Sequence, residues 1–267
     1  MKKFVALVSL AWVSLPATAA AAYTPRFTPM SLVDINVSVS CSLLPNRHEV
    51  SFSFRIQSAT DSKQNLGTLL LAYESPVDSS IPPAGWTSDD MTHGYWAFTV
   101  DFNGQLVPPG GYLDGAAFVS QGLPAVEPFR AKGDAPDPPP PPPDLTQEEY
   151  DAYMSAADYF NNSAKGYTVG PGPVTTSSPV ASIVSFLAAQ KEKAAGLGWI
   201  DNGGVVNSLD VKLDAAQRAL SRGDTKAARG ELAAFENEVK AQSGKHLDGN
   251  AVAILQTGAE VALNDLQ

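Results

Sequence analysis

Six consecutive prolines, Pro138 to Pro143, divide this chain of 267 residues into two parts with different hydrophobic periods. A proline run has no backbone donors and adopts a stiff polyproline II helix, so neither an α-helix nor a sheet can pass through it. We therefore predict that residues 134–144 form a linker that acts as a spacer. The alternative, a ligand for a proline-binding module, is disfavoured because such modules are mostly intracellular and the N-terminus predicts export.

Before the proline run, apolar and polar residues alternate. The clearest alternation covers residues 33–39, 50–56 and 96–102, and shorter runs occupy residues 69–73 and 116–120. A period of two with one apolar face is typical of half-buried antiparallel strands. Turn signals separate these runs at residues 45–46, 82–85, 103–104 and 108–111. The spacing predicts a small all-β sandwich over residues 23–133.

After the proline run, residues 145–178 are predicted to form a short helix followed by a Gly/Pro-rich loop. Thr146 and Glu149 have the spacing of a capping box, and an apolar-aromatic stripe continues to Phe160. Residues 161–178 are rich in glycine, proline, serine and threonine, a composition that favours a loop.

Residues 179–267 have the helical period. Apolar residues recur at spacings of three and four in four segments: Val180, Ile183, Val184 and Leu187; Leu209, Leu213, Ala216 and Leu220; Ala228, Leu232, Phe235 and Val239; Val252, Leu255, Ala259, Ala262, Leu263 and Leu266. Asp224 is a predicted N-cap, and Gly223 and Gly244 are predicted helix stops. Short amphipathic helices with short connections pack as an antiparallel bundle. We therefore predict a two-domain α+β protein in which a polyproline linker joins a β-sandwich to a small helical bundle.

The N-terminal residues 1–22 have the form of a cleavable secretory signal peptide. Lys2 and Lys3 precede an uncharged apolar run of about 12 residues, after which Pro16 and a series of small residues lead to cleavage near Ala20 or Tyr23. The run is too short for a membrane anchor, which needs roughly 20 residues, and no later stretch is long enough. The sequence predicts a secreted or periplasmic protein without a transmembrane span after signal removal.

The charge balance is acidic, with 18 Lys and Arg against 28 Asp and Glu. Loss of Lys2 and Lys3 with the signal would change the formal net charge from −10 to −12. Such a surface repels phosphate groups, which argues against nucleic acid and anionic lipid as partners. Cys41 is the only cysteine, so an internal disulfide is impossible, and stability must come from packed cores. We interpret Cys41 as a small core residue, with intermolecular pairing as the alternative.

The three histidines do not form a recognisable metal motif. His48, His93 and His246 are far apart in sequence and lack ligand spacing, and no nucleophile elbow of the G-x-S-x-G type occurs. The sequence therefore nominates no catalytic residue, metal site or cofactor.

Three groups of acidic residues were candidates for chemistry. Glu148 and Glu149 suit a glycosidase pair by residue type only, and their place at a helix start favours an N-terminal charge role. Residues 89–90 and 201–204 contain cation-binding residue types without the spacing of an EF-hand, so we interpret both as turns.

Two tryptophans of the β region have different predicted surroundings. Trp96 lies in phase with the buried face of its strand. Trp86 follows a Pro/Gly turn and is the better candidate for an exposed aromatic platform, although packing is the commoner role for a side chain of this size. Trp86 is the single candidate ligand-binding residue.

Four short motifs in the helical region occur in an ordered succession: residues 207–209, 212–216, 232–235 and 242–245. With these motifs, residues 180–266 resemble the FIMAH domain, a small helical module near the C-terminus of secreted bacterial proteins. Residues 83–86, 109–111, 120–124 and 168–171 resemble, more weakly, β modules that accompany it. The resemblance implies an extracellular accessory or interaction module and transfers no catalytic residues. The motifs also have packing explanations, since Asn207 or Ser208 could cap a helix and Gly244 could end one.

Three functional hypotheses follow. The first is a secreted non-catalytic protein that binds an extracellular or envelope protein or polysaccharide. The second is a carbohydrate-binding or carbohydrate-active accessory protein that uses the β domain around Trp86. The third is a structural envelope component in which both domains are spacers. The missing catalytic motifs favour the first hypothesis over an enzyme.

Overall fold

The computed structural model describes residues 25, 27–45, 48–91, 94–136, 138–158 and 160–267. They belong to two compact units: a small unit of residues up to 27 together with 138–157, and a main unit of residues 28–137 together with 158–267. The predicted signal peptide, residues 1–22, lies outside the described residues and stays a prediction. Within the described ranges, no helix is long and apolar enough to cross a bilayer.

The small unit contains the predicted short helix, α1 (Gln147–Ala157). Its capping box is confirmed: the Thr146 N–H donates to Glu149 Oε2 at 2.9 Å, and the Glu149 N–H donates to Thr146 Oγ1 at 3.3 Å. Tyr153 is buried, meets the Phe27 ring edge-on at a centroid distance of 5.2 Å, and donates its hydroxyl to the Pro139 carbonyl. One aromatic side chain thus holds the helix against the proline run.

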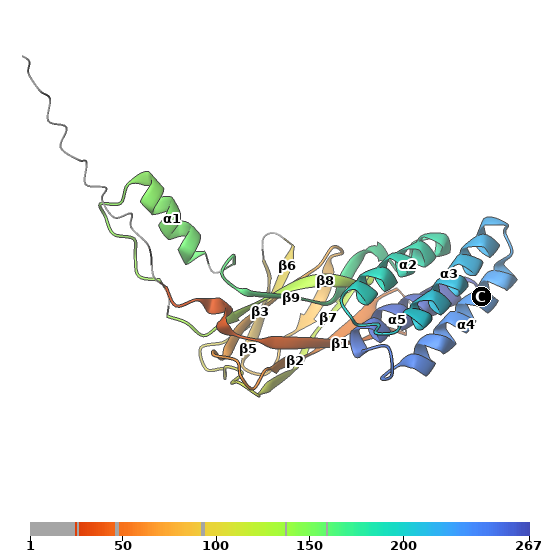
Figure 1. The fold of residues 1–267 in the computed structure, drawn as a ribbon, viewed down its shortest axis with the longest axis horizontal. Helices are drawn as coiled ribbons and strands as arrows, with labels where there is room; N and C mark the ends of the chain where they lie inside the picture. The colour runs from red at the N-terminus through yellow and green to blue at the C-terminus, as the bar shows by residue number, and fades with distance from the viewer. Residues whose placement is uncertain (1–24, 26, 46–47, 92–93, 137, 159) are drawn as a thin grey trace, which may run out of the picture. The chain divides into compact units, whose positions relative to one another are not determined.

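The main unit confirms a β-rich N-terminal region followed by helices (Figure 1). One antiparallel sheet, called sheet A, contains in spatial order β1 (Ile35–Leu43), β2 (Val50–Ser58), β7 (Tyr112–Ser120) and β4 (Val77–Ile81). The other, called sheet B, contains β5 (Trp86–Met91), β6 (Tyr95–Val100), β3 (Leu66–Ala72), β8 (Gly122–Gly133) and β9 (Ala164–Thr175). A short 3₁₀ helix, η1 (Met30–Leu32), precedes them.

Aromatic side chains pack the two sheets against each other. Phe54 of β2 lies 4.8 Å from Phe118 of β7 and 6.5 Å from Phe98 of β6, measured between ring centroids. The alternation predicted these inward positions, because all three belong to period-two runs. Phe102 was expected on the same face and this was wrong: β6 ends at Val100, and Phe102 is exposed in the following turn.

Strand β8 was not predicted from the sequence, because it contains Pro124 and Pro128. Its neighbour β3 pairs only with residues 129–133 of β8, whereas β9 pairs along nearly the whole strand. In the stretch without β3, the Val126 N–H donates to Gln190 Oε1 of a helix at 2.8 Å. Alternate N–H groups of a strand point to the same side, so an N–H at position 124 or 128 would point to the same side as the Val126 N–H. No residue of β3 pairs with this part of β8, so proline at these two positions costs the sheet no hydrogen bond to β3.

The prediction of a loop over residues 161–178 was wrong, because β9 occupies most of it. The glycines that indicated a loop instead allow close packing. A Cβ on Gly166 would lie 2.5 Å from Phe129 Cζ, and one on Gly170 would lie 2.5 Å from the Ala72 carbonyl oxygen. Glycine therefore marks close approach here, a role that sequence alone does not separate from a turn.

The predicted helices are confirmed as α2 (Val180–Gly196), α3 (Gly203–Ser221), α4 (Thr225–Gln242) and α5 (Gly249–Asp265). Asp224 caps α4 by accepting from the Ala227 N–H at 3.0 Å, and Gly223 has the positive φ of a helix stop, 73°. Capping by Asn207 or Ser208 was wrong, since both lie inside α3. Asn202 caps that helix instead, accepting from two backbone N–H groups.

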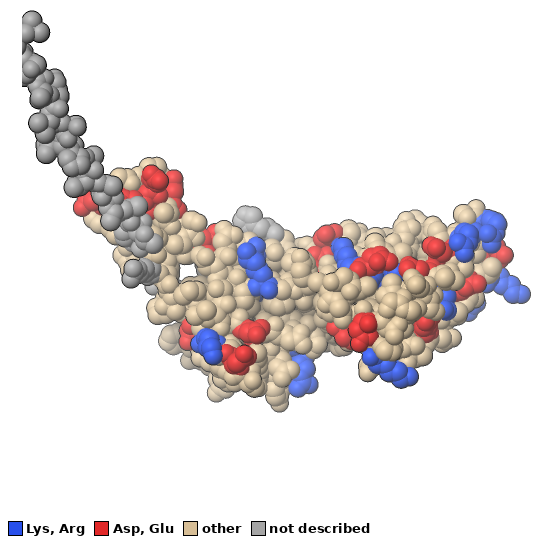
Figure 2. Space-filling view, in the orientation of Figure 1, with Lys and Arg blue, Asp and Glu red and all other residues tan. Residues whose placement is uncertain are grey.

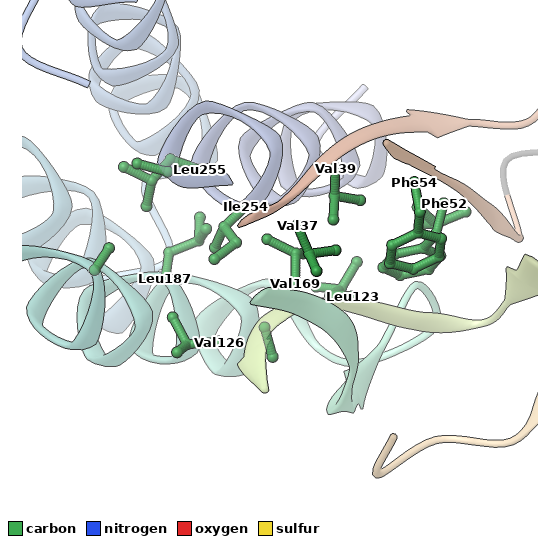
Figure 3. Packing of buried hydrophobic residues seen from close by; sticks show 14 of the residues in the cluster. Val37, Val39, Phe52, Phe54, Leu123, Val126, Val169, Leu187, Ile254 and Leu255 are labelled. Carbon is green, nitrogen blue, oxygen red and sulfur yellow. The ribbon is translucent and has the colours of Figure 1, made fainter. Parts of the chain in front are cut away.

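Sheets and helices share one hydrophobic cluster. Figure 3 shows the continuity: Val37 and Val39 of β1 lie between Phe54 of β2 and Ile254 of α5. The chain reaches α2 directly from β9, so the helices continue from sheet B rather than from the proline run. The proline run, which we predicted to join the sandwich to the bundle, instead follows β8 and leads to α1 of the small unit.

A buried asparagine fastens α5 to the open edge of sheet A. Asn250 accepts from the Val39 N–H at 2.9 Å and donates to the Val37 carbonyl at 3.1 Å, as a neighbouring strand would. Thr168 of β9 donates to the same Val37 carbonyl at 3.1 Å. Together with the Gln190 contact to β8, side-chain amides from two helices replace strand partners at both sheets.

A buried lysine joins α2 to α3. The Lys191 ammonium lies 2.6 Å from Glu192 Oε1 and 2.6 Å from Asp210 Oδ1.

We expect Lys191→Met to change the free energy of unfolding by less than about 1 kcal/mol. The substitution removes the attraction of the ion pairs and also the cost of burying the ammonium, and these two changes often cancel. We expect Asp210→Ala to lower it by about 1 to 3 kcal/mol, because the ammonium then keeps one carboxylate. Urea unfolding measures both, and equal losses would contradict this account.

Candidate functional site

Trp86, the candidate platform, is buried. Its side chain is 5% exposed and belongs to the common hydrophobic cluster, so the exposure that a sugar platform requires is absent. The packing interpretation of Trp86 is confirmed. The Trp86 N–H donates to the Pro83 carbonyl at 3.0 Å, which closes the predicted turn and directs the indole into the core at the start of β5.

The other sequence candidates do not assemble into a site. His48 is exposed, His246 Nδ1 lies 2.7 Å from Asp201 Oδ1, and His93 lies outside the described residues. Among the described residues, no three His, Cys, Asp or Glu side chains are grouped as metal ligands. Cys41 is half-buried in β1, where desolvation raises the pKa of its thiol.

Asp89 and Asp90 were expected in a turn and lie instead on the edge strand β5. The Tyr73 hydroxyl donates to Asp90 Oδ1 at 2.5 Å, and this hydrogen bond raises the pKa of Tyr73 to about 12. The carboxylate of Asp90 therefore ties the end of β3 to β5 rather than holding a cation.

Among the described residues, a pocket lies where sheet B meets the end of α2. It has a volume of about 420 Å³ and is lined by Glu74, Val126, Glu127, Pro128, Tyr167, Lys193, Gly196 and Leu197. A volume of this size is in the range of small-molecule sites. The pocket combines two carboxylates, one ammonium and an apolar wall, a mixture that binds polar groups in a defined orientation.

Backbone contacts fix the walls of the pocket. The Glu74 N–H donates to the Pro171 carbonyl at 2.8 Å, which places Glu74 beside β9 just after β3 ends. The Val126–Gln190 hydrogen bond anchors β8 to α2 one residue before Glu127. Lys193 stands on the last turn of α2, and Leu197 is its C-cap. Strand β8, the bend that follows β3 and the end of α2 thus present these side chains.

Glu127 is the most perturbed group of the pocket. It is 5% exposed, and burial together with the nearby Glu74 carboxylate raises its pKa from 4.5 to about 7, while Lys193 acts in the opposite direction. Strong perturbation of a titratable group in a pocket is typical of functional sites. At neutral pH, Glu127 therefore exists in both protonation states.

The pocket mouth exposes apolar surface. Tyr167 on β9 is 55% exposed and Leu197 is 38% exposed. Single exposed apolar residues are ordinary, but here two of them border one polar pocket. Tyr167 gives a ring face and a hydroxyl, which suits a ligand with an apolar body.

Two smaller pockets lie on sheet B away from this site. They have volumes of about 260 and 180 Å³ and share Thr68, Thr99 and Lys132. Figure 2 shows basic and acidic side chains interspersed on the visible face of the main unit, without an extended basic patch there. The pocket at the end of α2 is therefore the candidate site.

The helical segment that contributes Lys193 and Leu197 to this pocket matches a known domain family. Residues 185–264 match the family model of the FIMAH domain. The matched segment begins inside α2 and ends inside α5, close to the predicted limits of 180–266. No curated protein matches the chain.

The FIMAH motif residues have structural roles. Lys212 of α3 pairs with Glu238 Oε2 of α4 at 2.6 Å, and the Ser208 hydroxyl donates to the same oxygen at 2.9 Å. Gly244 has a φ of 70° after α4, as a helix stop requires. The FIMAH segment also supplies Lys193 and Leu197 to the pocket, although neither lies in the motifs that carried the resemblance.

No sequence pattern predicted the charged residues of the pocket. Glu74, Glu127 and Lys193 are 53 or more residues apart in sequence, and no short motif relates them. One signal was present: an acidic residue in an otherwise apolar strand, Glu127 in GLPAVEPF, is a candidate for a function because burying a charge is costly.

Proposed function

We propose that this protein is an exported, non-catalytic binding protein of the cell envelope or extracellular space, and that its ligand occupies the pocket between sheet B and α2. The observation that carries the proposal is the pocket itself, in which exposed Tyr167 and Leu197 border the buried Glu127. Export is supported by the N-terminal residue pattern and by the FIMAH match, whose resemblance implies an extracellular module.

The core shared by sheets and helices determines which form of the protein must be used in a binding experiment. Because α2 and α5 pack on the sheets through Gln190 and Asn250, the isolated helices would expose apolar surface and unpaired groups. Binding should therefore be measured with the mature chain, whose N-terminus is expected at Ala20 or Tyr23. N-terminal sequencing of the exported protein checks this expectation, and recovery of uncleaved protein in the cytoplasm would contradict export.

We expect the immobilised mature chain to retain a protein or polysaccharide from cell-envelope fractions, and Tyr167→Ala to abolish this retention. Tyr112→Ala is the matched control, because Tyr112 is 61% exposed and lies on β7 of sheet A. Gel and carbohydrate analysis of the eluted material measures the outcome. Equal retention by both variants would exclude the pocket, and release of a chemically altered product would contradict a non-catalytic role.

A further inference from the structure

The carboxyl group of Glu127 has no hydrogen-bond or ion-pair partner in the part of the chain that the structure describes. Although the side chain is nine-tenths buried, none of the hydrogen bonds and ion pairs found among the described residues includes it. Nearby Glu74 repels its charge, and Lys193 lies near enough to affect its pKa without forming an ion pair with it. A buried carboxylate is stabilised only by a counter-charge or donors, and the pocket is the side from which a ligand can supply them.

Lys193 is the matching group of opposite charge. It stands in the last turn of α2 and lines the same pocket, and no ion pair within the described part of the chain includes it. The pocket therefore holds one carboxylate on β8, a second carboxylate just after β3, and a separate ammonium on the helix. A ligand with one group of each charge would satisfy both, whereas a simple cation would face Lys193 unfavourably.

The rest of the lining is apolar. Val126, Pro128 and Leu197 supply aliphatic surface, and Tyr167 supplies a half-exposed ring. This surface suits a hydrocarbon or aromatic body of a few carbon atoms, in a volume of about 420 Å³.

We propose that the pocket binds a small zwitterion with an apolar side chain, either a free amino acid or a short peptide. The ligand ammonium contacts Glu127 and Glu74, its carboxylate contacts Lys193, and its side chain lies against Tyr167 and Leu197. The proposal rests on the proposed function, since it names the ligand class of the same pocket.

Calorimetric titration of the mature chain with L-phenylalanine tests the proposal. Three comparison probes each change one feature: 2-phenylethylamine lacks the carboxylate, N-acetyl-L-phenylalanine lacks the ammonium, and phenylalanyl-glycine separates a peptide from a free amino acid. We expect phenylalanine or the dipeptide to bind at least about tenfold more tightly than the first two probes, since a hydrogen-bonded charge pair contributes about that factor. The tighter of the two identifies the source.

Variants assign the contacts. Glu127→Gln should weaken phenylalanine binding about tenfold to hundredfold, whereas Glu260→Gln on the exposed side of α5 should not change it. Lys193→Met should weaken phenylalanine binding but not 2-phenylethylamine binding, because 2-phenylethylamine has no carboxylate to lose and is relieved of repulsion by the Lys193 ammonium. Near pH 6.5, binding should release protons from the wild type, because a ligand ammonium favours ionised Glu127, and should not release them from Glu127→Gln. The other charged or titratable groups at this pocket are Glu74, Lys193 and Tyr167.

Several results would overturn the proposal. They are equal binding of phenylalanine and its N-acetyl derivative, unchanged affinity of Glu127→Gln for phenylalanine, or no binding of phenylalanine at a concentration of about 10 mM. That concentration lies above the millimolar dissociation constants of weakly bound small ligands. Cellobiose binding without phenylalanine binding would replace the zwitterion by a sugar. In each case, retention of envelope material that depends on Tyr167 would still support the proposed function, so the two can fail separately.

Discussion

The Asn250→Ala protein is expected to unfold with a free energy about 1 to 3 kcal/mol lower than that of the wild type. The substitution removes the acceptor of the Val39 N–H, and burial keeps water from replacing it. The Val37 carbonyl keeps Thr168 as a donor, so one backbone group rather than two is left unsatisfied. Urea unfolding followed by circular dichroism measures the change.

Asn207→Ala is the matched control for this result. Asn207 is exposed on α3, and we expect its removal to change stability by less than about 0.5 kcal/mol. The double variant Asn250→Ala with Thr168→Val should lose more than the sum of the single losses, because only the double variant strips the Val37 carbonyl of both donors. Additive losses, or equal stability of the two asparagine variants, would show that α5 is not held on β1 by this amide.

The Glu127→Gln protein is expected to be more stable than the wild type by about 1 to 3 kcal/mol near pH 8 and equally stable near pH 4. Burial raises the pKa of Glu127 from 4.5 to about 7, so the folded protein binds a proton more tightly than the unfolded chain. The wild type is therefore relatively most stable below about pH 4.5, and it loses this contribution as pH rises to about 7. Glutamine stays neutral and removes the loss.

Two further variants isolate the cause of this pH dependence. Glu74→Gln removes the repulsion and lowers the pKa of Glu127, so the loss of stability should be smaller than in the wild type and should end at a lower pH. Glu127→Gln should abolish the loss entirely. Glu260→Gln should leave the profile unchanged. Asp248, whose pKa burial also raises, contributes in the same direction in every one of these proteins and cancels in the differences. A stability difference that does not vary with pH would contradict ionisation of Glu127 as its source.

The stability profile also makes the binding test decisive. A variant that loses its ligand often does so because it unfolds, but Glu127→Gln is expected to be folded and more stable at neutral and alkaline pH. Loss of phenylalanine binding in a stabilised protein would therefore report the contact itself.

The sequence by itself determined the local structure of this protein. Period-two runs located β1, β2, β3, β6 and β7, and the spacing of three and four located α2 to α5. The caps at Thr146 and Asp224 and the stop at Gly223 were also predicted, since capping depends on residues within one turn of each other. The FIMAH resemblance agrees with the family match.

The tertiary structure alone decided what the local patterns meant. Glycines predicted a loop over the segment that forms β9, where they are needed for close packing against β8. Prolines argued against a strand at β8, and only the strand pairing shows that the backbone N–H groups they remove would have had no β3 partner. Trp86 followed a turn and was a candidate for exposure, yet its turn directs it into the core. The pocket joins Glu74, which follows β3, with Glu127 of β8 and Lys193 of α2. Burial and the proximity of distant charges arise from packing, so a one-dimensional pattern could not reveal the site.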